Sequence, residues 1–291
     1  MIRARIKNAV ILGLSALALT TASAHAQDFE RIGTSLTDTL QSAIDLLPPG
    51  VNDVRVGLGP GLYPDFEGSR HSSIHAVPVV SLRYRDLVEV LNNEIRVTAF
   101  NKLFAPAVNS EKPGGSLRVG PLLSLNFGRD EGDSPDLTGM GSVGTSIELG
   151  AFVSYLLPSD RFRARIRQDV AGGHKGATLQ LDYTHTFIRA ERLSLSGSIG
   201  AMGGSAAYMK SFFGVNVIQS ARTGLPTYRP KTGFKDVNAG INGSYIISDN
   251  WSVFATVGYK RFIGTVADSP LIRLRGSKNN VSASSFIVYG F

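Results

Sequence analysis

The heptapeptide RFRARIR, residues 161–167, is the most informative stretch of this chain about its fold. Apolar residues alternate in it with a row of arginines, Arg161, Arg163, Arg165 and Arg167. A period of two is that of a β-strand, whose successive side chains point to opposite faces. An arginine that faces lipid near the middle of a bilayer costs ~2–4 kcal/mol. If the apolar face of this strand meets lipid, the arginines must therefore face an enclosed interior.

The same period of two recurs from residue 51 to the end of the chain. It is seen at residues 54–58, 74–84, 115–127, 142–157, 179–187, 193–201, 237–245 and 251–260, and from about residue 279 onward. Such strands are typical of transmembrane β-barrels, although a soluble β-sandwich also alternates. No apolar stretch after residue 50 reaches the roughly 18 residues that a spanning helix needs. Because lipid cannot satisfy an open sheet edge, a membrane protein built of these strands must be a closed antiparallel barrel.

Loop lengths favour the barrel over the sandwich. Tight connections are predicted at residues 85–86, 158–160, 189–191 and 249–250, and longer ones at 64–73, 128–141, 204–235 and 264–277. Bacterial barrels combine short periplasmic turns with long external loops. All the long loops fall on one side only if residues 86–103 hold two short strands that turn near Asn92 and Asn93. That arrangement predicts twelve strands with both chain ends in the periplasm.

Two further features bear on this all-β assignment. The two short strands carry Glu89, Glu94 and Arg96, so ten strands remain the alternative. The chain ends with apolar residues at every second position, which resembles the signal read by the barrel assembly machinery. We predict that this assembly signal consists of Ile287, Tyr289 and Phe291.

The N-terminus predicts export. Arg3, Arg5 and Lys7 precede an apolar run at residues 9–19, and small residues lead to Ala-His-Ala at 24–26. This pattern predicts a cleaved signal peptide, residues 1–26, with a retained membrane anchor as the alternative. Its removal takes three of the 30 Lys and Arg residues and leaves 27 against 23 acidic residues, a net charge of +4, so no nucleic-acid partner is implied. The chain has no cysteine, which excludes disulfides, a thiol nucleophile and Cys-ligated zinc.

Residues 27–50 form a separate segment before the predicted barrel, residues 51–291. Their apolar residues recur at helical spacing, at Phe29, Ile32, Leu36, Leu40, Ile44 and Leu47. Pro48, Pro49 and Gly50 end the run, so we predict a short amphipathic helix. The helix either lies on the periplasmic rim or plugs the barrel mouth, and disorder is the third alternative.

The polar faces predict what the barrel encloses. Glu148 on the preceding strand and Asp182 on the following strand are available to pair with the row at Arg161–Arg167. The row serves either ion pairing within a small barrel or a selective conduit for anionic solutes. Residues 208–224 predict a short external helix folded over the mouth, as a loop with its own small core or as an adhesive or gating lid. The residues assigned to this external lid are Phe212, Phe213, Gln219 and Tyr228.

The sequence offers no support for a catalytic site or a metal site. His71, His75 and His174 fall in or beside predicted external loops, where histidines are usually solvated, and His185 falls on an outward face. No spacing favours a His–acid pair or a third metal ligand. The glycines at residues 57–61 lack the Lys-Ser/Thr pair and the helix of a phosphate loop, and are better explained by crowding in a curved strand. We predict no enzyme activity, no cofactor and no metal.

The sequence resembles the MltA-interacting protein family, also called the MipA/OmpV family. The resemblance covers roughly residues 51–291 and rests on ordered segments: 83–86 (RYRD), 118–121 (RVGP), 127–131 (FGRDE), 163–176 (RARIRQDVAGGHKG), 213–215 (FGV) with 219–220 (QS), 224–226 (GLP) with Tyr228, 233–237 (GFKDV), and 268–270 (DSP) with 275–277 (RGS). The segment at 27–50 departs from the family by being longer and more helical.

The resemblance implies a scaffold of the Gram-negative cell envelope, placed in the outer membrane among lipid and lipopolysaccharide. Such a scaffold brings a lytic transglycosylase together with a bifunctional penicillin-binding protein during peptidoglycan synthesis. Other members of the family are described as osmotically regulated proteins, adhesins or porin-like channels, and no catalytic residues are established to transfer. We expect residues 27–50 and the 104–114 turn to provide the periplasmic contacts. The rival hypotheses are a small-solute channel and adhesion through residues 204–235.

Overall fold

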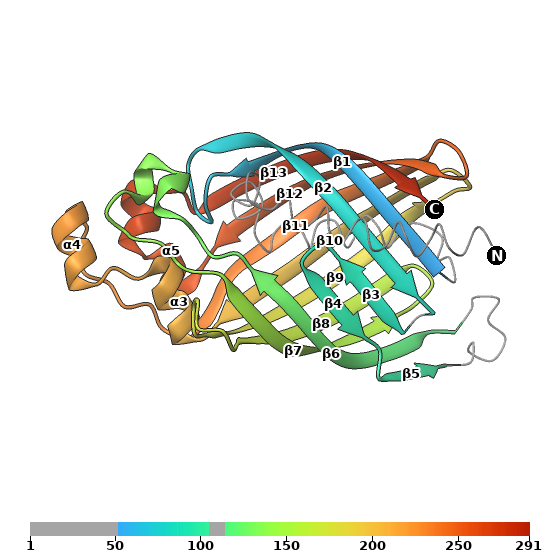
Figure 1. Ribbon diagram of the computed structural model, residues 1–291, viewed down its shortest axis with the longest axis horizontal. Coiled ribbons are helices and arrows are strands. Elements are labelled where there is room, and N and C mark those ends of the chain that lie inside the picture. Colours follow the sequence, from blue (N-terminus) through green and yellow to red (C-terminus); the bar gives the residue numbers. More distant parts are fainter. Residues whose placement is uncertain (1–51, 86, 105–113) are drawn as a thin grey trace, which may run out of the picture.

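The strands of this chain form one closed sheet around a lumen (Figure 1). The structure, a computed structural model, describes residues 52–85, 87–104 and 114–291. The predicted signal peptide, the segment at 27–50 and most of the 104–114 turn lie outside these residues. In the part of the chain that is described, no helix is both long and apolar enough to cross a membrane.

The barrel has twelve positions in its wall. Its strands are β1 (Asn52–Pro64), β2 (Ser72–Tyr84), β3 (Val88–Leu91), β4 (Glu94–Val97), β5 (Phe100–Leu103), β6 (Ser116–Asn126), β7 (Ser146–Leu156), β8 (Asp160–Asp169), β9 (Ala177–Arg189), β10 (Leu193–Gly204), β11 (Gly233–Ile246), β12 (Trp251–Phe262) and β13 (Asn279–Gly290). Strands adjacent in sequence pair antiparallel, with the exception of β4 and β5. In addition, β1 pairs with β13, and β4 pairs with β6. Because β4 and β5 pair with successive parts of β6, they share one position. The predicted twelve-stranded antiparallel barrel is confirmed.

The short hairpin β3–β4 is what distinguishes twelve strands from ten. Its strands are only four residues each, and they turn at Asn92 and Asn93 as the loop lengths predicted. Asn92 has a φ of 46°, a left-handed conformation that asparagine tolerates better than most residues. Asn92 also exchanges hydrogen bonds with the backbone of Val80 on β2.

Glycines of β1 permit the close approach of β13, where the first and last strands meet. A Cβ added to Gly59 would lie 1.8 Å from the carbonyl oxygen of Ser285, and one added to Gly57 would lie 2.7 Å from that of Ile287. A side chain at either position would therefore separate the two strands. The glycines at 57–61 serve backbone packing within the wall.

The two ends of the barrel differ, as predicted. The short-turn end carries connections at residues 157–159, 190–192 and 247–250, the start of β1 and the C-terminus. The opposite end, the loop end, carries residues 65–71, 127–145, 170–176, 205–232 and 263–278. All described helices lie at the loop end (Figure 1): η1 (Glu131–Asp133), η2 (Pro135–Leu137), α3 (Ala206–Phe213), α4 (Val217–Thr223), α5 (Gly264–Ala267) and η3 (Leu271–Arg275).

Two predicted boundaries were wrong. The strand expected at 142–157 begins only at Ser146, because Val143 pairs with Arg129 inside the loop. The single helix expected at 208–224 is two helices, since Gly214 ends α3 and Asn216 begins α4 with a reciprocal cap to Gln219.

The wall has an apolar outer face. Ile74, Leu149, Ile166, Ile199 and Ile241 are between 51% and 74% exposed. Their neighbours in sequence point inward and are mostly polar and buried. Aromatic side chains gather at the short-turn end, where Trp251, Tyr289 and Phe291 pack together, as in the aromatic girdles of transmembrane barrels. This arrangement places lipid around the wall and polar groups in the lumen.

Candidate functional site

The arginines of β8 line the lumen, and their main anion is Glu94 of β4. An oxygen of Glu94 lies 2.5 Å from Nη2 of Arg167, and its other oxygen lies 3.5 Å from Nη1 of Arg165 and 3.5 Å from Nε of Arg96. Glu94, Arg165 and Arg167 are all at most 3% exposed. One carboxylate from the short hairpin thus compensates three arginines of two strands.

A second carboxylate, Glu89 of β3, serves the part of the lumen nearer the short-turn end. It lies 2.9 Å from Arg96, 3.5 Å from Arg83 and 3.6 Å from Arg118. Asp182 of β9 completes the set with a contact of 2.8 Å to Arg165. We call this set the arginine network; its members are Arg83, Glu89, Glu94, Arg96, Arg118, Arg161, Arg163, Arg165, Arg167 and Asp182.

Sequence reasoning found one of these acids as a partner and missed two. The contact to Asp182 agrees with the prediction, whereas the only expectation for Glu89 and Glu94 is that their charges leave ten strands possible. The available signal was the alternation itself, because Glu94 and Arg96 share one face of a strand. An acid on an inward face of a barrel with an arginine row is a candidate partner for that row.

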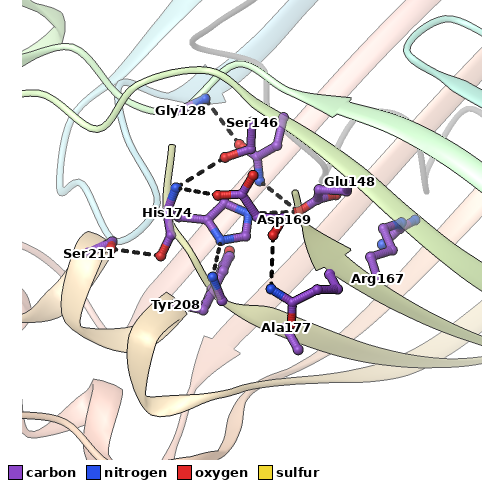
Figure 2. Close-up of polar contacts among 12 residues, drawn as sticks. Gly128, Ser146, Glu148, Arg167, Asp169, His174, Ala177, Tyr208 and Ser211 are labelled. Carbon is purple, nitrogen blue, oxygen red and sulfur yellow. Dashed lines mark hydrogen bonds and ion pairs between the residues drawn. The ribbon is translucent and has the colours of Figure 1, made fainter. Parts of the chain in front are cut away.

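Glu148 faces the lumen but pairs with His174, which corrects the expectation that it pairs with the arginine row (Figure 2). Its Oε1 atom lies 2.8 Å from Nε2 of His174, and both side chains are at most 1% exposed. The other ring nitrogen, Nδ1, accepts a hydrogen bond of 3.1 Å from the backbone N–H of Gly176. Nε2 is therefore the protonated nitrogen that donates to Glu148.

The burial of His174 also corrects the expectation that loop histidines are solvated. Its turn closes around Asp169, which accepts hydrogen bonds from the backbone N–H groups of Ala171, Gly172, His174 and Lys175. With both ring nitrogens engaged and no solvent contact, His174 is a structural anchor and is not poised as a general base.

The lid, residues 205–232, attaches to this anchor. Figure 2 shows His174 between the wall and α3, where its carbonyl accepts a hydrogen bond of 3.1 Å from Ser211 and its ring meets that of Tyr208 edge-on. From the facing loop, Arg129 donates to the carbonyl of Phe212 at 2.6 Å. Burial lowers the pKa of Arg129 to about 10, which leaves it charged at neutral pH.

Two apolar clusters close the mouth beneath and beside the lid. The first joins α3 to β12, α5 and η3; it comprises Met202, Tyr208, Met209, Phe212, Phe213, Phe262, Val266, Ala267 and Ile272. The second joins the remaining loops and comprises Phe66, Leu137, Met140, Val215, Leu225 and Leu271. The structure places both Phe212 and Phe213 in the first cluster. Gln219 donates to the carbonyl of Met140, and the Tyr228 hydroxyl donates to that of Thr265, so both tie the lid to neighbouring loops.

An ion cluster below α3 fastens the first external loop to the wall. Glu67 lies 2.5 Å from Nζ of Lys235 on β11 and 2.9 Å from Nζ of Lys260 on β12. Burial opposes ionisation of Glu67, but the two ammonium groups outweigh it and lower its pKa to about 2. Nζ of Lys235 also lies 5.6 Å from the ring centroid of Tyr208, which adds a cation–π contact to the lid.

One side of the lumen is apolar, which sequence reasoning missed. We call it the apolar wall; it comprises Tyr63, Val77, Val79, Leu91, Phe254, Phe286 and Val288. These side chains come from β1, β2, β3, β12 and β13, and each is at most 3% exposed. The signal in the sequence was a loss of alternation. In β2, the inward residues Val77 and Val79 are apolar, as are the outward residues on either side of them. The lumen therefore has an arginine side and an apolar side.

The rim of the short-turn end carries a strand with a free edge. In the described part of the chain, β5 pairs with β6 alone, and all four of its side chains are exposed. The Phe104 N–H donates to the carbonyl of Gly115 at 2.8 Å. Counting back from Phe104, the backbone groups of every second residue therefore point toward β6. Asn101 and Leu103 then direct their backbone groups away from β6. Figure 1 shows β5 at the rim that holds the C-terminus.

The remaining predicted residues take no part in a reactive site. Ile287 is half exposed on the outer face, while Tyr289 and Phe291 belong to the aromatic cluster; their role as assembly signal stays a prediction. His71 lies 3.8 Å from Asp136, and His185 lies 2.8 Å from Asp160 at the outer surface. Among the described residues, no group of three or more His, Asp or Glu could hold a metal ion.

Comparison with known proteins agrees with this architecture. The profile of a family described as "MltA-interacting protein MipA" matches residues 56–291. A 24 kDa outer membrane protein of Pasteurella multocida is 26% identical over 136 residues, which are 45% of this chain and 52% of that protein. The MltA-interacting protein of Escherichia coli is 31% identical over 80 residues, which are 28% of this chain and 32% of that protein. The matches thus span about half the length of the first relative and about a third of the second.

Solved structures show a similar kind of barrel at low identity. The NanC porin covers 82% of this chain and 98% of its own, with 12% identity and a TM-score of 0.40. An outer membrane channel from Pseudomonas putida covers 84% and 97%, with 13% identity and a TM-score of 0.40.

Proposed function

This chain belongs to the MltA-interacting protein MipA family and lies in the outer membrane, and we propose that it is a non-catalytic interaction protein. It holds a lytic transglycosylase at the periplasmic rim and links that enzyme to a penicillin-binding protein. In this setting the short-turn end faces the periplasm and the loop end faces outward. The relative in Escherichia coli is named for an interaction with MltA, which supports the proposed class of partner.

The closed external mouth favours an interaction protein over a constitutively open channel. Tyr208, Met209 and Phe213 of α3 and Leu271 of η3 come from two different loops and are at most 2% exposed. A lid buried to this degree resembles the interior of a protein, which is closely packed. Solute passage would require the lid to unpack, whereas binding at the opposite end would not.

The free edge of β5 is the observation that carries the proposal. An unpaired strand edge recruits an extended segment of another protein by main-chain hydrogen bonds, with side chains on alternate positions giving specificity. Phe100 and Leu103 are 51% and 77% exposed. This edge therefore offers apolar side chains and free backbone groups at a rim whose other described turns are short.

The edge can be tested without disturbing the barrel. Asn101→Pro removes an N–H that points away from β6 and adds a ring that blocks a new strand, whereas proline is tolerated on edge strands. We expect N101P to lose at least ten-fold in capture of purified lytic transglycosylase from the same bacterium, and N101A to bind as the parent does. Unchanged capture by N101P, with heat-modifiable migration on gels intact, would overturn the proposal.

A conduit for anionic solutes is the second candidate, favoured by the composition of the arginine network. The network contains seven arginines and three acids. A lumen lined by this row of arginines would select anions if both of its ends opened.

A further inference from the structure

We propose that an acylated amphiphile of the outer leaflet binds at an open edge of β2. The site lies in the barrel wall, between the turn of the β3–β4 hairpin and the loop end. The amphiphile is a lipid molecule whose hydroxyl, ester or amide groups adjoin an acyl chain. This site is separate from the edge of β5 and shares with that proposal only the orientation of the barrel.

On one of its sides, β2 has a neighbouring strand over only part of its length. It pairs with β1 from Ser72 to Tyr84, but with β3 only from Ser81 to Tyr84. The turn of the hairpin adds a bond between Asn92 and the backbone of Val80. From there to the loop end, no strand among the described residues pairs with this side of β2. Figure 1 shows β2 and β6 diverging from the short hairpin toward the loop end.

The alternation of the strand identifies the backbone groups that point to the open side. The N–H and C=O of Val80 both point to the hairpin, because both are hydrogen-bonded to Asn92. Every second residue before Val80 therefore presents its backbone groups on the same side. These residues are Pro78, Ala76 and Ile74, and we call them the β2 edge. Pro78 agrees with this assignment, because proline has no N–H and is confined to edge strands or bulges within sheets.

The surroundings of the β2 edge are apolar. Ile74 is 74% exposed on the outer face, Val80 is 40% exposed, and Leu125 beside the hairpin turn is 39% exposed. Residues 76–80 carry no polar side chain that could bond the backbone. An unpaired backbone donor or acceptor is costly in hydrocarbon. The N–H groups of Ile74 and Ala76 therefore require polar partners within an apolar frame.

An amphiphile supplies both kinds of contact. Its hydroxyl, ester or amide groups exchange hydrogen bonds with the backbone of the β2 edge, while its acyl chain covers Ile74, Val80 and Leu125. A further β-strand fits less well, because Pro78 interrupts the row of backbone donors along the edge. Water would bond the backbone but would leave the apolar side chains without a matching neighbour. Lipid surrounds an outer-membrane barrel on every side, so this occupant is present at the site at high concentration.

Competitive photolabelling of the full chain in detergent tests the site. The probe is a monoacylglycerol that carries a diazirine in its acyl chain, and peptide mapping locates the labelled strands. We expect labelling of β2 to saturate with probe concentration and to fall at least five-fold when excess unlabelled monoacylglycerol is added. The outer face of β12 is the internal control, because β12 is paired on both sides. Its labelling should rise without saturation and fall less than two-fold.

A pair of variants tests the role of the backbone. Ala76→Pro removes an N–H that points away from β1, so the β1–β2 ladder is kept. We expect A76P to lose the saturable labelling of β2, whereas Ala76→Val keeps the N–H and should label as the parent does. Heat-modifiable migration checks that each barrel is folded. Labelling of β2 in the parent that competes no more strongly than labelling of β12, or saturable labelling retained in A76P, would overturn the proposal.

Discussion

The carboxylate of Glu94 is the shared partner of three buried arginines. Its carboxylate meets Arg96, Arg165 and Arg167 while only 2% of the residue is exposed. Removing one partner of a buried ion pair costs about 3–5 kcal/mol, because the charges left behind remain desolvated. Here three cations would lose the same anion. The wall at that point consists of two strands of only four residues each.

We therefore expect Glu94→Gln to destabilise the barrel by about 3–5 kcal/mol. The urea midpoint for unfolding in detergent should fall, and fluorescence of Trp251 can follow the transition. Glu191→Gln, in an exposed short turn, removes the same charge without a buried partner and should leave the midpoint unchanged. Equal midpoints for E94Q and the parent would show that the arginines are compensated by other groups.

Another residue-scale feature is the pH response of Glu67. Its pKa is lowered from 4.5 to about 2, so its contacts to Lys235 and Lys260 contribute stability that is fully present above pH 4.5. That stability is lost as the pH falls through about 2.

The thermal midpoint of the parent should thus hold near neutral pH and decline below pH 4.5 by an amount that Glu67→Gln lacks. At pH 7, E67Q should already unfold at a lower temperature, since two buried ammonium groups lose their shared anion. Circular dichroism melts from pH 7 to pH 2.5 give both curves. Parallel curves for the two proteins would contradict a lowered pKa at this loop.

At the scale of elements, the loops act as one assembly. Three side chains illustrate this. Arg129 donates to the carbonyl of Phe212 and Ser269 to that of Phe213. Arg275 donates to the carbonyls of Asp136 and Thr223. Loop carbonyls that lie outside helices and strands lack a backbone donor. The two arginine side chains donate to such carbonyls, so the loops are held together with little secondary structure. The external end consequently behaves as a small core placed on top of the barrel.

At the scale of the whole molecule, the lid covers the external end of the barrel, and the short-turn end carries the free edge of β5. The wall between these two ends is stable against lipid because arginines and acids face inward. Such a barrel can present its periplasmic rim to partners while the lid stays packed. Any transport through the barrel would depend on displacing the lid.

We expect the barrel to conduct better when the lid is removed. A variant with residues 205–232 replaced by a short Gly-Ser turn should conduct several-fold more than the full chain in planar bilayers. It should prefer chloride to potassium, because the arginines of β8 line the lumen. Cation preference in this variant, or an equal conductance of the full chain, would contradict this view of the lumen.

The alternation in the sequence is enough to predict the class of fold and the face on which a strand residue lies, because a period of two assigns successive side chains to opposite faces. The inward row at Arg161–Arg167 and the hairpin turn at Asn92 were both readable from that rule and from loop lengths. The partners of these residues emerge only in the folded barrel: Glu94 for the arginines, His174 for Glu148, and Val77 beside Phe286 in the apolar wall. Those contacts join residues far apart in the chain, and they depend on barrel closure and strand register, which no local pattern encodes.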